Sequence, residues 1–209
     1  MAFLILIRHG VTDWNVEGRW HGLTDIPLNE EGARESKLAA EAIKDLTVDS
    51  AYTSELVRTK QTYQNICDTL KLTCPVVNSP ALNERDYGMF AGKNKWAVRD
   101  TLGNEEFLKL RRDFNKPIPG GESLKDVYGR VVPFYKEQIM KDIRAGKNVL
   151  VVSSGNTLRA LIKHIENISD EDISKFELNF GEIRIFQFDD EGEIVGKEVR
   201  GQNLYQKAH

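Results

Sequence analysis

The chain has 209 residues, of which 40% are hydrophobic and 29% charged, as is typical of a globular domain with a substantial core. Its 29 Lys and Arg against 32 Asp and Glu leave a formal net charge of −3, which disfavours a general nucleic-acid binder. The N-terminal apolar run at 3–7 is too short for a membrane span or a signal peptide, and two cysteines fit neither a disulfide framework nor a structural zinc site. We expect a single cytoplasmic domain over 1–209, with no nucleic-acid or membrane partner.

Strands and helices are predicted to alternate along the chain. Runs of apolar and β-branched residues predict strands over 3–7, 48–54, 148–153 and 183–188, and a weaker one over 76–82 that Pro80 interrupts. Helical spacing of apolar residues predicts helices over 29–46, 55–70, 123–143 and 158–165. This alternation indicates an α/β fold, with a mainly parallel central sheet and helices on both faces.

Several details of these helices are also predicted. Asn29 and Ser54 are the expected N-caps of the first two helices, and Pro133 is expected to kink the third. In the first helix, the apolar face is predicted to consist of Leu38, Ala42 and Leu46. Residues 84–122 lack a long clean period and hold several glycine turn signals, which predicts a lid-like excursion with short helices.

Ligands of open parallel sheets collect beyond the carboxyl ends of the strands. Arg8-His9-Gly10 directly follows the first strand, and 154–159 follow the strand over 148–153 and open a helix whose N-terminus suits an anion. A neutral imidazole is a good nucleophile toward phosphorus, and Arg8 can neutralise phosphoryl oxygens. An isolated Arg-His-Gly is more often a histidine that simply ends a strand, so the surrounding sequence decides between the two interpretations.

That surrounding sequence resembles the histidine phosphatase superfamily and, within it, the cofactor-dependent phosphoglycerate mutases. The similar stretches occur in the family's order along most of the chain. They are Leu-Ile-Arg-His-Gly-Val-Thr-Asp-Trp-Asn at 6–15, Arg-Trp-His-Gly at 19–22, Asp-Ile-Pro-Leu at 25–28, Thr-Ser-Glu-Leu-Val-Arg-Thr at 53–59, Leu-Asn-Glu-Arg-Asp-Tyr-Gly at 82–88, Arg-Arg at 111–112 and Gly-Asn-Thr-Leu-Arg-Ala-Leu at 155–161.

The resemblance implies a role for each matching residue. His9 would carry phosphohistidine, Arg8 and Arg58 would bind the transferring phosphoryl group, and Glu84 would be the general acid and base. The implied substrate-binding set is Arg8, Asn15, His21, Gly22, Arg58, Glu84, Tyr87, Lys95, Arg111, Arg112, Gly155 and Asn156. The resemblance further implies small phosphorylated carboxylic acids as partners and 2,3-bisphosphoglycerate as the priming phosphate donor. The histidines are scattered, and no spacing of His, Cys or carboxylates predicts a metal site. We expect a homodimer, although the family also forms monomers and tetramers.

Phosphoryl transfer mostly demands in-line positioning and neutralised oxygens, which arginine forks supply without a metal. The leaving alkoxide needs a proton, and a carboxyl group beside a phosphate dianion is expected to hold one part of the time. Without the resemblance, Glu84 would be interpreted as a surface carboxylate paired with Arg85, and Arg111 and Arg112 as a solvated helix face. Trp14 is expected in the core.

The sequence departs from the family at position 154, which carries serine where the family has its second catalytic histidine. Serine can donate one hydrogen bond but cannot be cationic, and it is also a preferred N-cap. Ser154 is therefore an introduced substitution, a natural divergence with weak activity, or the mark of a pseudoenzyme. We favour a weakened enzyme, because the other expected site residues are present. Asp86, where mutases tend to have histidine, adds negative charge near Glu84.

Three functions follow from this pattern. The leading one is a phosphoglycerate mutase of glycolysis and gluconeogenesis, an isomerase that interconverts 3-phosphoglycerate and 2-phosphoglycerate through phosphohistidine. The second is a phosphatase of small phosphorylated metabolites that uses the same His9, and the third is a catalytically silent binder of phosphorylated acids. The anion-binding group Tyr87, Lys95, Arg111 and Arg112 favours the mutase, which must retain a bisphosphate intermediate.

Overall fold

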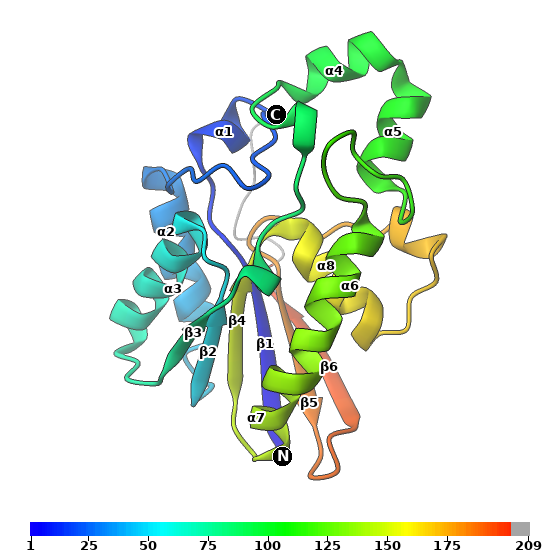
Figure 1. Cartoon of the computed structure of the whole chain (residues 1–209). Coiled ribbons are helices and arrows are strands. Elements are labelled where there is room, and N and C mark those ends of the chain that lie inside the picture. Colours follow the sequence, from blue (N-terminus) through cyan, green and yellow to red (C-terminus); the bar gives the residue numbers. More distant parts are fainter. Residues whose placement is uncertain (202–209) are drawn as a thin grey trace.

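The computed structural model describes residues 1–201, and within them six strands form one central sheet (Figure 1). The strand order is β3-β2-β4-β1-β5-β6. The first four strands in this order run parallel, whereas β5 and β6 are antiparallel to their neighbours. The bounds are Ala2–Arg8 for β1, Ser50–Thr53 for β2, Val76–Asn78 for β3, Val149–Ser153 for β4, Ile183–Phe188 for β5 and Ile194–Arg200 for β6.

Helices cover both faces of this sheet, because its central strands are apolar on both sides. Leu4 and Leu6 of β1 pack into the cluster that includes helices α6, α7 and α8, whereas Ile5 and Ile7 pack against helices α2 and α3. The prediction of a mainly parallel sheet with helices on both faces is confirmed. These helices are α2 Glu30–Ala42, α3 Val57–Leu70, α6 Leu124–Phe134, α7 Met140–Arg144 and α8 Gly155–Ile165.

Several predicted boundaries are wrong. The helix predicted over 29–46 ends at Ala42. The weak strand over 76–82 stops at Asn78, because Pro80 has no N–H for a ladder and begins a 3₁₀ turn, Pro80–Leu82. Helix α3 begins after Leu56, so Ser54 is not its cap. Helix α8 begins at Gly155, three residues earlier than predicted. Strand β6 was not predicted; it lies at the sheet edge and most of its residues are exposed, so its sequence lacks a buried alternation.

Helix α2 has the predicted N-cap, as Asn29 accepts a hydrogen bond from the Gly32 N–H at 2.9 Å. Its buried face differs from the predicted one, since Leu38, Ala42 and Leu46 are only half-buried. The buried positions are Gly32, Glu35, Ser36, Ala39 and Ala40. These residues are mostly small, which lets the helix backbone approach the chain after β1: a Cβ on Gly32 would meet the Val11 carbonyl oxygen at 2.0 Å.

The third predicted helix remains helical through Pro133. Its predicted inward residues are all buried, namely Leu124, Val127, Val131, Tyr135 and Ile139. Directly after Pro133 the chain widens into a π-helical turn, Tyr135–Ile139, before α7. A proline inside a helix removes one intrahelical hydrogen bond, and the wider turn accommodates this loss.

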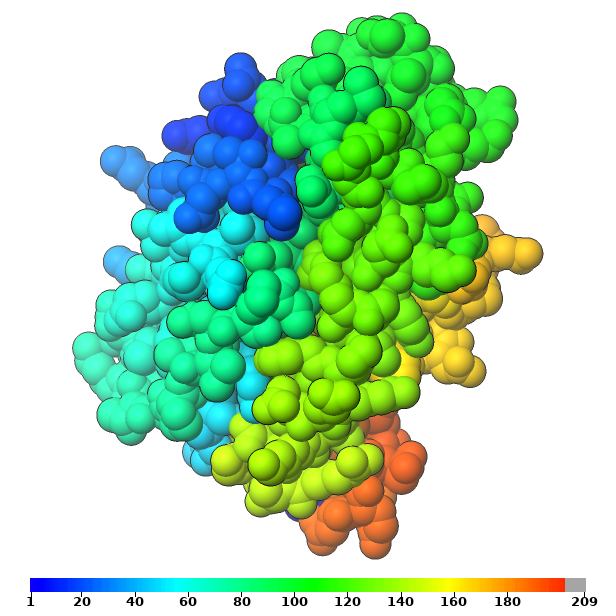
Figure 2. All heavy atoms as spheres, viewed as in Figure 1, coloured from blue at the N-terminus to red at the C-terminus, as the bar shows by residue number. Residues whose placement is uncertain are grey.

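Residues 84–122 form the predicted excursion with short helices, α4 Lys95–Leu102 and α5 Asn104–Arg112, above the carboxyl ends of the parallel strands (Figure 1). They enclose a third apolar cluster, which includes Trp20, Tyr87, Phe90 and Phe107. The short helix α1, Asp13–Val16, was not predicted, and its loop joins this excursion through an isolated bridge between Arg19 and Asn94. In Figure 2 the blue surface of this loop borders the green surface of the excursion at the top of the molecule. None of the described helices is long and apolar enough to cross a membrane.

Candidate active site

The carboxyl ends of β1 and β4 bring the two predicted site segments together. Arg8 pairs with Ser153 in the parallel ladder, and the His9 N–H donates to the Ser153 carbonyl oxygen at 2.9 Å. A cavity of about 560 Å³ opens at this edge, beneath the 84–122 excursion. Among the residues predicted for the site, those that line it are Arg8, His9, Asn15, His21, Glu84, Tyr87, Lys95, Arg111, Arg112, Gly155 and Asn156.

His9 is 3% exposed, and its environment keeps the imidazole neutral. Burial, then the charges of Arg58 and Arg8, hold the pKa of His9 well below its usual value of 6.5. The ring Nδ1 lies 2.8 Å from the Gly10 carbonyl oxygen. Because a carbonyl oxygen only accepts hydrogen bonds, Nδ1 of the neutral ring carries the proton and Nε2 carries the lone pair. His9 therefore has the tautomer that a nucleophile requires.

Arg8 lies beside His9 and is half-buried. Its guanidinium carbon is 3.7 Å from the centre of the Phe180 ring, and its Nη1 donates to the Leu178 carbonyl oxygen at 3.3 Å. Its Nε is buried and has no hydrogen-bond partner among the described residues. A buried donor without a partner is costly, so this atom is suited to an anionic ligand.

Glu84 reaches the cavity from the segment that leads into the excursion. Its Oε1 accepts backbone N–H groups from Arg85 at 2.8 Å and from Asn156, at the start of α8, at 3.3 Å. These two contacts orient the carboxyl group and leave Oε2 as the oxygen for proton exchange with a ligand. The alternative interpretation, a surface carboxylate paired with Arg85, does not hold: Glu84 is 8% exposed, and Arg85 directs its guanidinium to three backbone carbonyls.

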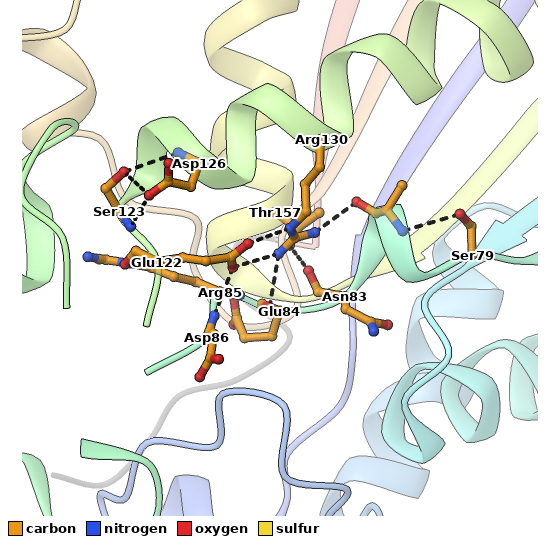
Figure 3. A network of polar contacts seen from close by, with 11 residues as sticks. Ser79, Asn83, Glu84, Arg85, Asp86, Glu122, Ser123, Asp126, Arg130 and Thr157 are labelled. Atoms are coloured by element: carbon orange, nitrogen blue, oxygen red, sulfur yellow. Dashed lines mark hydrogen bonds and ion pairs between the residues drawn. The ribbon is translucent and has the colours of Figure 1, made fainter. Parts of the chain in front are cut away.

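The backbone around Glu84 is held by a polar network behind the cavity (Figure 3). Arg130 donates to the Glu84 carbonyl oxygen at 3.0 Å and forms an ion pair with Glu122 at 2.9 Å, and Thr157 donates to the Asn83 carbonyl oxygen at 2.5 Å. Asp86 points into its own turn, where it accepts the Gly88 N–H at 2.8 Å. It does not line the cavity, so the expected contribution of its charge next to Glu84 has no direct contact to support it.

Asn156 links several groups on one side of the cavity. Its side-chain amide donates to the Tyr87 hydroxyl at 3.0 Å and accepts from Arg159 at 3.0 Å. Burial, followed by the charge of Glu84, raises the pKa of Tyr87, so its hydroxyl keeps its proton. Burial lowers the pKa of Arg159 to about 10, which leaves it cationic at neutral pH. Its Nε is buried without a partner among the described residues.

Three predicted site residues do not line the cavity: Gly22, Arg58 and Ser154. Arg58 is fully buried and donates to the carbonyl oxygens of Thr24 and Gly22, each at 3.0 Å. Ser154 occupies the N-cap position of α8, but its side chain makes no capping hydrogen bond, and its buried Oγ has no partner among the described residues. The expectation that Ser154 acts as a side-chain cap is therefore wrong.

Trp14 is half-buried rather than part of the core, and it packs on the His21 ring with 5.7 Å between ring centroids. The cavity also has lining residues that were not predicted from the sequence. They are Arg19, Trp20, Glu35, Trp96, Arg159 and Glu177–Phe180. Arg159 lies in a quoted motif, three residues after Asn156 on one helix face, so its spacing could have revealed it. The loop Glu177–Phe180 has no such signal.

The loop before β5 contacts the site arginines directly. Glu177 forms an ion pair with Arg112, which also donates to the Phe176 carbonyl oxygen at 3.4 Å. Phe180 and Leu178 contact Arg8 as described above. A carboxylate and an aromatic face thus occupy the guanidinium groups where an anionic ligand would bind. Within residues 1–201, no group of three or more His, Cys, Asp and Glu side chains is placed to hold a metal ion.

Comparisons with known proteins agree with this geometry. Residues 4–198 match the pattern of the Histidine phosphatase superfamily (branch 1). The chain is 38% identical to the 2,3-bisphosphoglycerate-dependent phosphoglycerate mutase of Cytophaga hutchinsonii, over 90% of this chain and 88% of that one. It is 40% identical to the enzyme of that name from Brucella melitensis biotype 2, over 94% and 97%. Among solved structures, a mycobacterial glucosyl-3-phosphoglycerate phosphatase has a TM-score of 0.82 at 22% identity, covering 97% of this chain and 99% of that one. Bacillus stearothermophilus YhfR has a TM-score of 0.81 at 24% identity, covering 97% and 96%.

Proposed function

The chain belongs to the histidine phosphatase superfamily, and on this premise we propose that it is a 2,3-bisphosphoglycerate-dependent phosphoglycerate mutase. It interconverts 3-phosphoglycerate and 2-phosphoglycerate in the cytoplasm, in glycolysis and gluconeogenesis. The observation that carries the proposal is a neutral, buried His9 in a cavity whose lining also includes Lys95, Arg111 and Arg112. Relatives at 38% and 40% identity with that name support it.

His9 Nε2 is the nucleophile. Its lone pair forms the N–P bond while the bond from phosphorus to the substrate oxygen breaks, and Gly10 holds the proton on Nδ1 throughout. Arg8 neutralises the phosphoryl oxygens through its Nε, which has no partner among the described residues, and through Nη1, which donates to the Leu178 carbonyl oxygen before the ligand binds. Arg58 does not line the cavity, but its positive charge lowers the pKa of His9 and so helps to keep the imidazole neutral.

Glu84 transfers the proton. When the P–O bond breaks, the substrate alkoxide takes a proton from the Glu84 carboxyl group, and in the return step Glu84 removes a proton from the attacking hydroxyl. Asn156 and Arg85 hold Oε1 through their backbone N–H groups, so the same oxygen faces the reacting atoms in both directions.

Tyr87, Lys95, Arg111 and Arg112 bind the carboxylate and the second phosphate of the substrate, and Asn15, Gly155 and Asn156 line the phosphoryl end. A bisphosphate fits this cavity, because two of its lining arginines, Arg8 and Arg159, each have a buried Nε without a partner among the described residues. When bound, 2,3-bisphosphoglycerate supplies the priming phosphoryl group. Gly22 serves the loop backbone, where its φ of 54° forms a left-handed turn against Tyr87.

Ser154 makes this mutase slow. It places a short hydroxyl where the family has an imidazole, and the loss of one charge-stabilising donor commonly costs on the order of a hundredfold in rate. The competing proposals remain a phosphatase that passes the phosphoryl group to water and a silent binder of phosphorylated acids. The further cations of the lining, Lys95, Arg111 and Arg112, favour the mutase over both, since a reaction on one phosphoryl group needs no second anion site.

The test is labelling with 2,3-bisphosphoglycerate that carries radioactive phosphorus. We expect an acid-labile adduct, absent from His9→Asn and retained by His164→Asn, whose ring lies outside this cavity against Tyr128. Conversion of 3-phosphoglycerate to 2-phosphoglycerate should depend on added bisphosphate. Phosphate release without isomerisation would identify a phosphatase, and binding without an adduct would identify a silent binder. The expected homodimer is checked by sedimentation.

A further inference from the structure

A second imidazole lines the cavity although position 154 carries serine. His21 lies in the loop between α1 and α2, and its ring centroid is 6.2 Å from that of His9, with an angle of 61° between the ring planes. The resemblance to the mutases does not make His21 an obvious replacement for the missing histidine, because those enzymes more usually carry a small hydroxyl residue at this position. The fold places it at the phosphoryl end of the site.

The His21 ring is held rigidly. It is 7% exposed and packs on Trp14, and its Nε2 lies 2.5 Å from the hydroxyl oxygen of the fully buried Thr12. The left-handed turn at Gly22 fixes the backbone that follows, because a Cβ there would meet the Tyr87 backbone nitrogen at 3.0 Å. A side chain fixed in this way loses little conformational freedom when it contacts a ligand.

The Thr12 hydroxyl has one proton and lies 2.5 Å from His21 Nε2 and 3.1 Å from Asn15 Oδ1. Donation over the shorter contact, to Nε2, places the ring proton of the neutral imidazole on Nδ1, which is then the nitrogen that can donate to a ligand. The charged groups around the ring are cationic, namely Arg58, Lys95 and Arg8, and together with burial they lower the pKa of His21 to about 3. The neighbouring cations disfavour protonation of the His21 ring, and a bound anion reduces that penalty. A phosphoryl group bound to His9 brings that negative charge between the two rings.

We infer that His21 is a catalytic residue of the proposed reaction: its Nδ1 donates a hydrogen bond to the phosphoryl group as that group moves onto and off His9 Nε2. His21 forms no covalent bond with the substrate and accepts no proton from it. His21 thus supplies one imidazole donor from the first loop, which offsets only part of the loss caused by serine at position 154. This inference rests on the proposed function, since it requires phosphorylation of His9.

A double-mutant cycle between His21→Thr and Ser154→His tests it, because two groups that share one task give non-additive effects. The measurement is the single-turnover rate of labelled phosphoryl transfer from 2,3-bisphosphoglycerate to His9. With Ser154 present, His21→Thr should slow the transfer by about a hundredfold, the cost of losing one oxyanion donor. In the Ser154→His background the same change should cost about threefold or less. Equal factors in the two backgrounds would overturn the role of His21.

Two further variants avoid any dependence on the folding of Ser154→His. His21→Asn keeps an N–H donor near the place of Nδ1 and loses the contact with Thr12, whereas His21→Gln reaches toward Thr12 and loses the donor at Nδ1. We expect the Asn variant to transfer phosphoryl groups at least about tenfold faster than the Gln variant. The reverse order would show that His21 only supports the loop. An adduct that forms equally fast in all variants overturns the role of His21 alone, whereas no adduct even in the unchanged chain overturns the proposed function as well.

Discussion

The Asn156 N–H lies 3.3 Å from Glu84 Oε1, although 72 positions separate the two residues in the chain. Asn156 is in the first turn of α8, and Glu84 is at the entrance to the excursion that covers the cavity. One hydrogen bond therefore ties the proposed proton donor to the helix that starts beside His9. The same residue, Asn156, holds Tyr87 at 3.0 Å, so the excursion is attached to the sheet through side chains of the site itself.

Glu84→Gln is expected to lower kcat by about 10²- to 10⁴-fold, the usual contribution of a general acid or base. The amide oxygen of Gln can still accept the N–H groups of Arg85 and Asn156, so the structure and the KM should change little. Steady-state mutase assays check this. Glu35→Gln is the matched control, because Glu35 also lines the cavity and accepts a backbone N–H, from Val11 at 2.7 Å. If both variants lost activity equally, proton transfer by Glu84 would be refuted.

Glu177→Gln is expected to tighten the binding of 3-phosphoglycerate. Glu177 forms an ion pair with Arg112, which the substrate must displace. The Glu177 side chain is 54% exposed, and such pairs are worth about 0.2–1 kcal/mol, so the Kd should fall by about 1.4- to fivefold. Calorimetric titration measures this change. Glu171→Gln removes the same charge from an exposed position nearby and should leave the Kd unaltered; a similar gain there would indicate a general charge effect.

Ser154→His is expected to raise kcat by about tenfold or more, since the second imidazole adds a donor at the phosphoryl end. The buried Oγ of Ser154 has no partner among the described residues, so its removal breaks no hydrogen bond within them. Mutase assays with saturating 2,3-bisphosphoglycerate check the prediction, and a thermal melt confirms that the variant is folded. A folded variant without any gain would contradict the proposal that Ser154 limits the rate.

The stability of the protein should fall as the pH decreases from 6.5 to 5. Burial holds the pKa of His9 well below 6.5 and that of His21 at about 3, so both rings are neutral in the folded chain. In the unfolded chain they titrate near 6.5 and bind protons below it, which favours unfolding by about 1.4 kcal/mol per pH unit for each ring. Urea denaturation at several pH values measures the slope. His21→Gln should reduce the dependence of the unfolding free energy on pH by the contribution of one histidine. An unchanged slope would contradict the neutral state of the ring.

Much of the fold could be predicted from local sequence patterns. The strands over 3–7 and 148–153 are continuous apolar runs, and only a strand covered on both faces can bury every residue of such a run. The predicted inward residues of α6 are buried because they follow the helical period. Strand β6 was missed because most of its residues are exposed at the sheet edge, where no apolar alternation is required.

The chemistry of single residues was less predictable. Trp14 is apolar and was expected in the core. It lies instead in the short helix α1, which the sequence did not indicate, and packs on the His21 ring. Asp86 was expected to influence Glu84, but the local turn directs its carboxylate to the Gly88 N–H. Both depend on the direction of a side chain, which periodicity does not encode outside regular elements.

The sequence by itself determined the α/β class, the two strand ends that meet at the site, and His9 as the residue for phosphoryl chemistry, because strand burial and local motifs depend on neighbouring residues. Only the tertiary structure decided which side chains face the cavity. Arg58 and Ser154 lie outside the cavity lining, whereas Arg159 and the loop Glu177–Phe180 are part of it. The fold also places His21 beside His9. These arrangements depend on contacts between segments far apart in the chain, and the packing that creates them is a property of the whole fold.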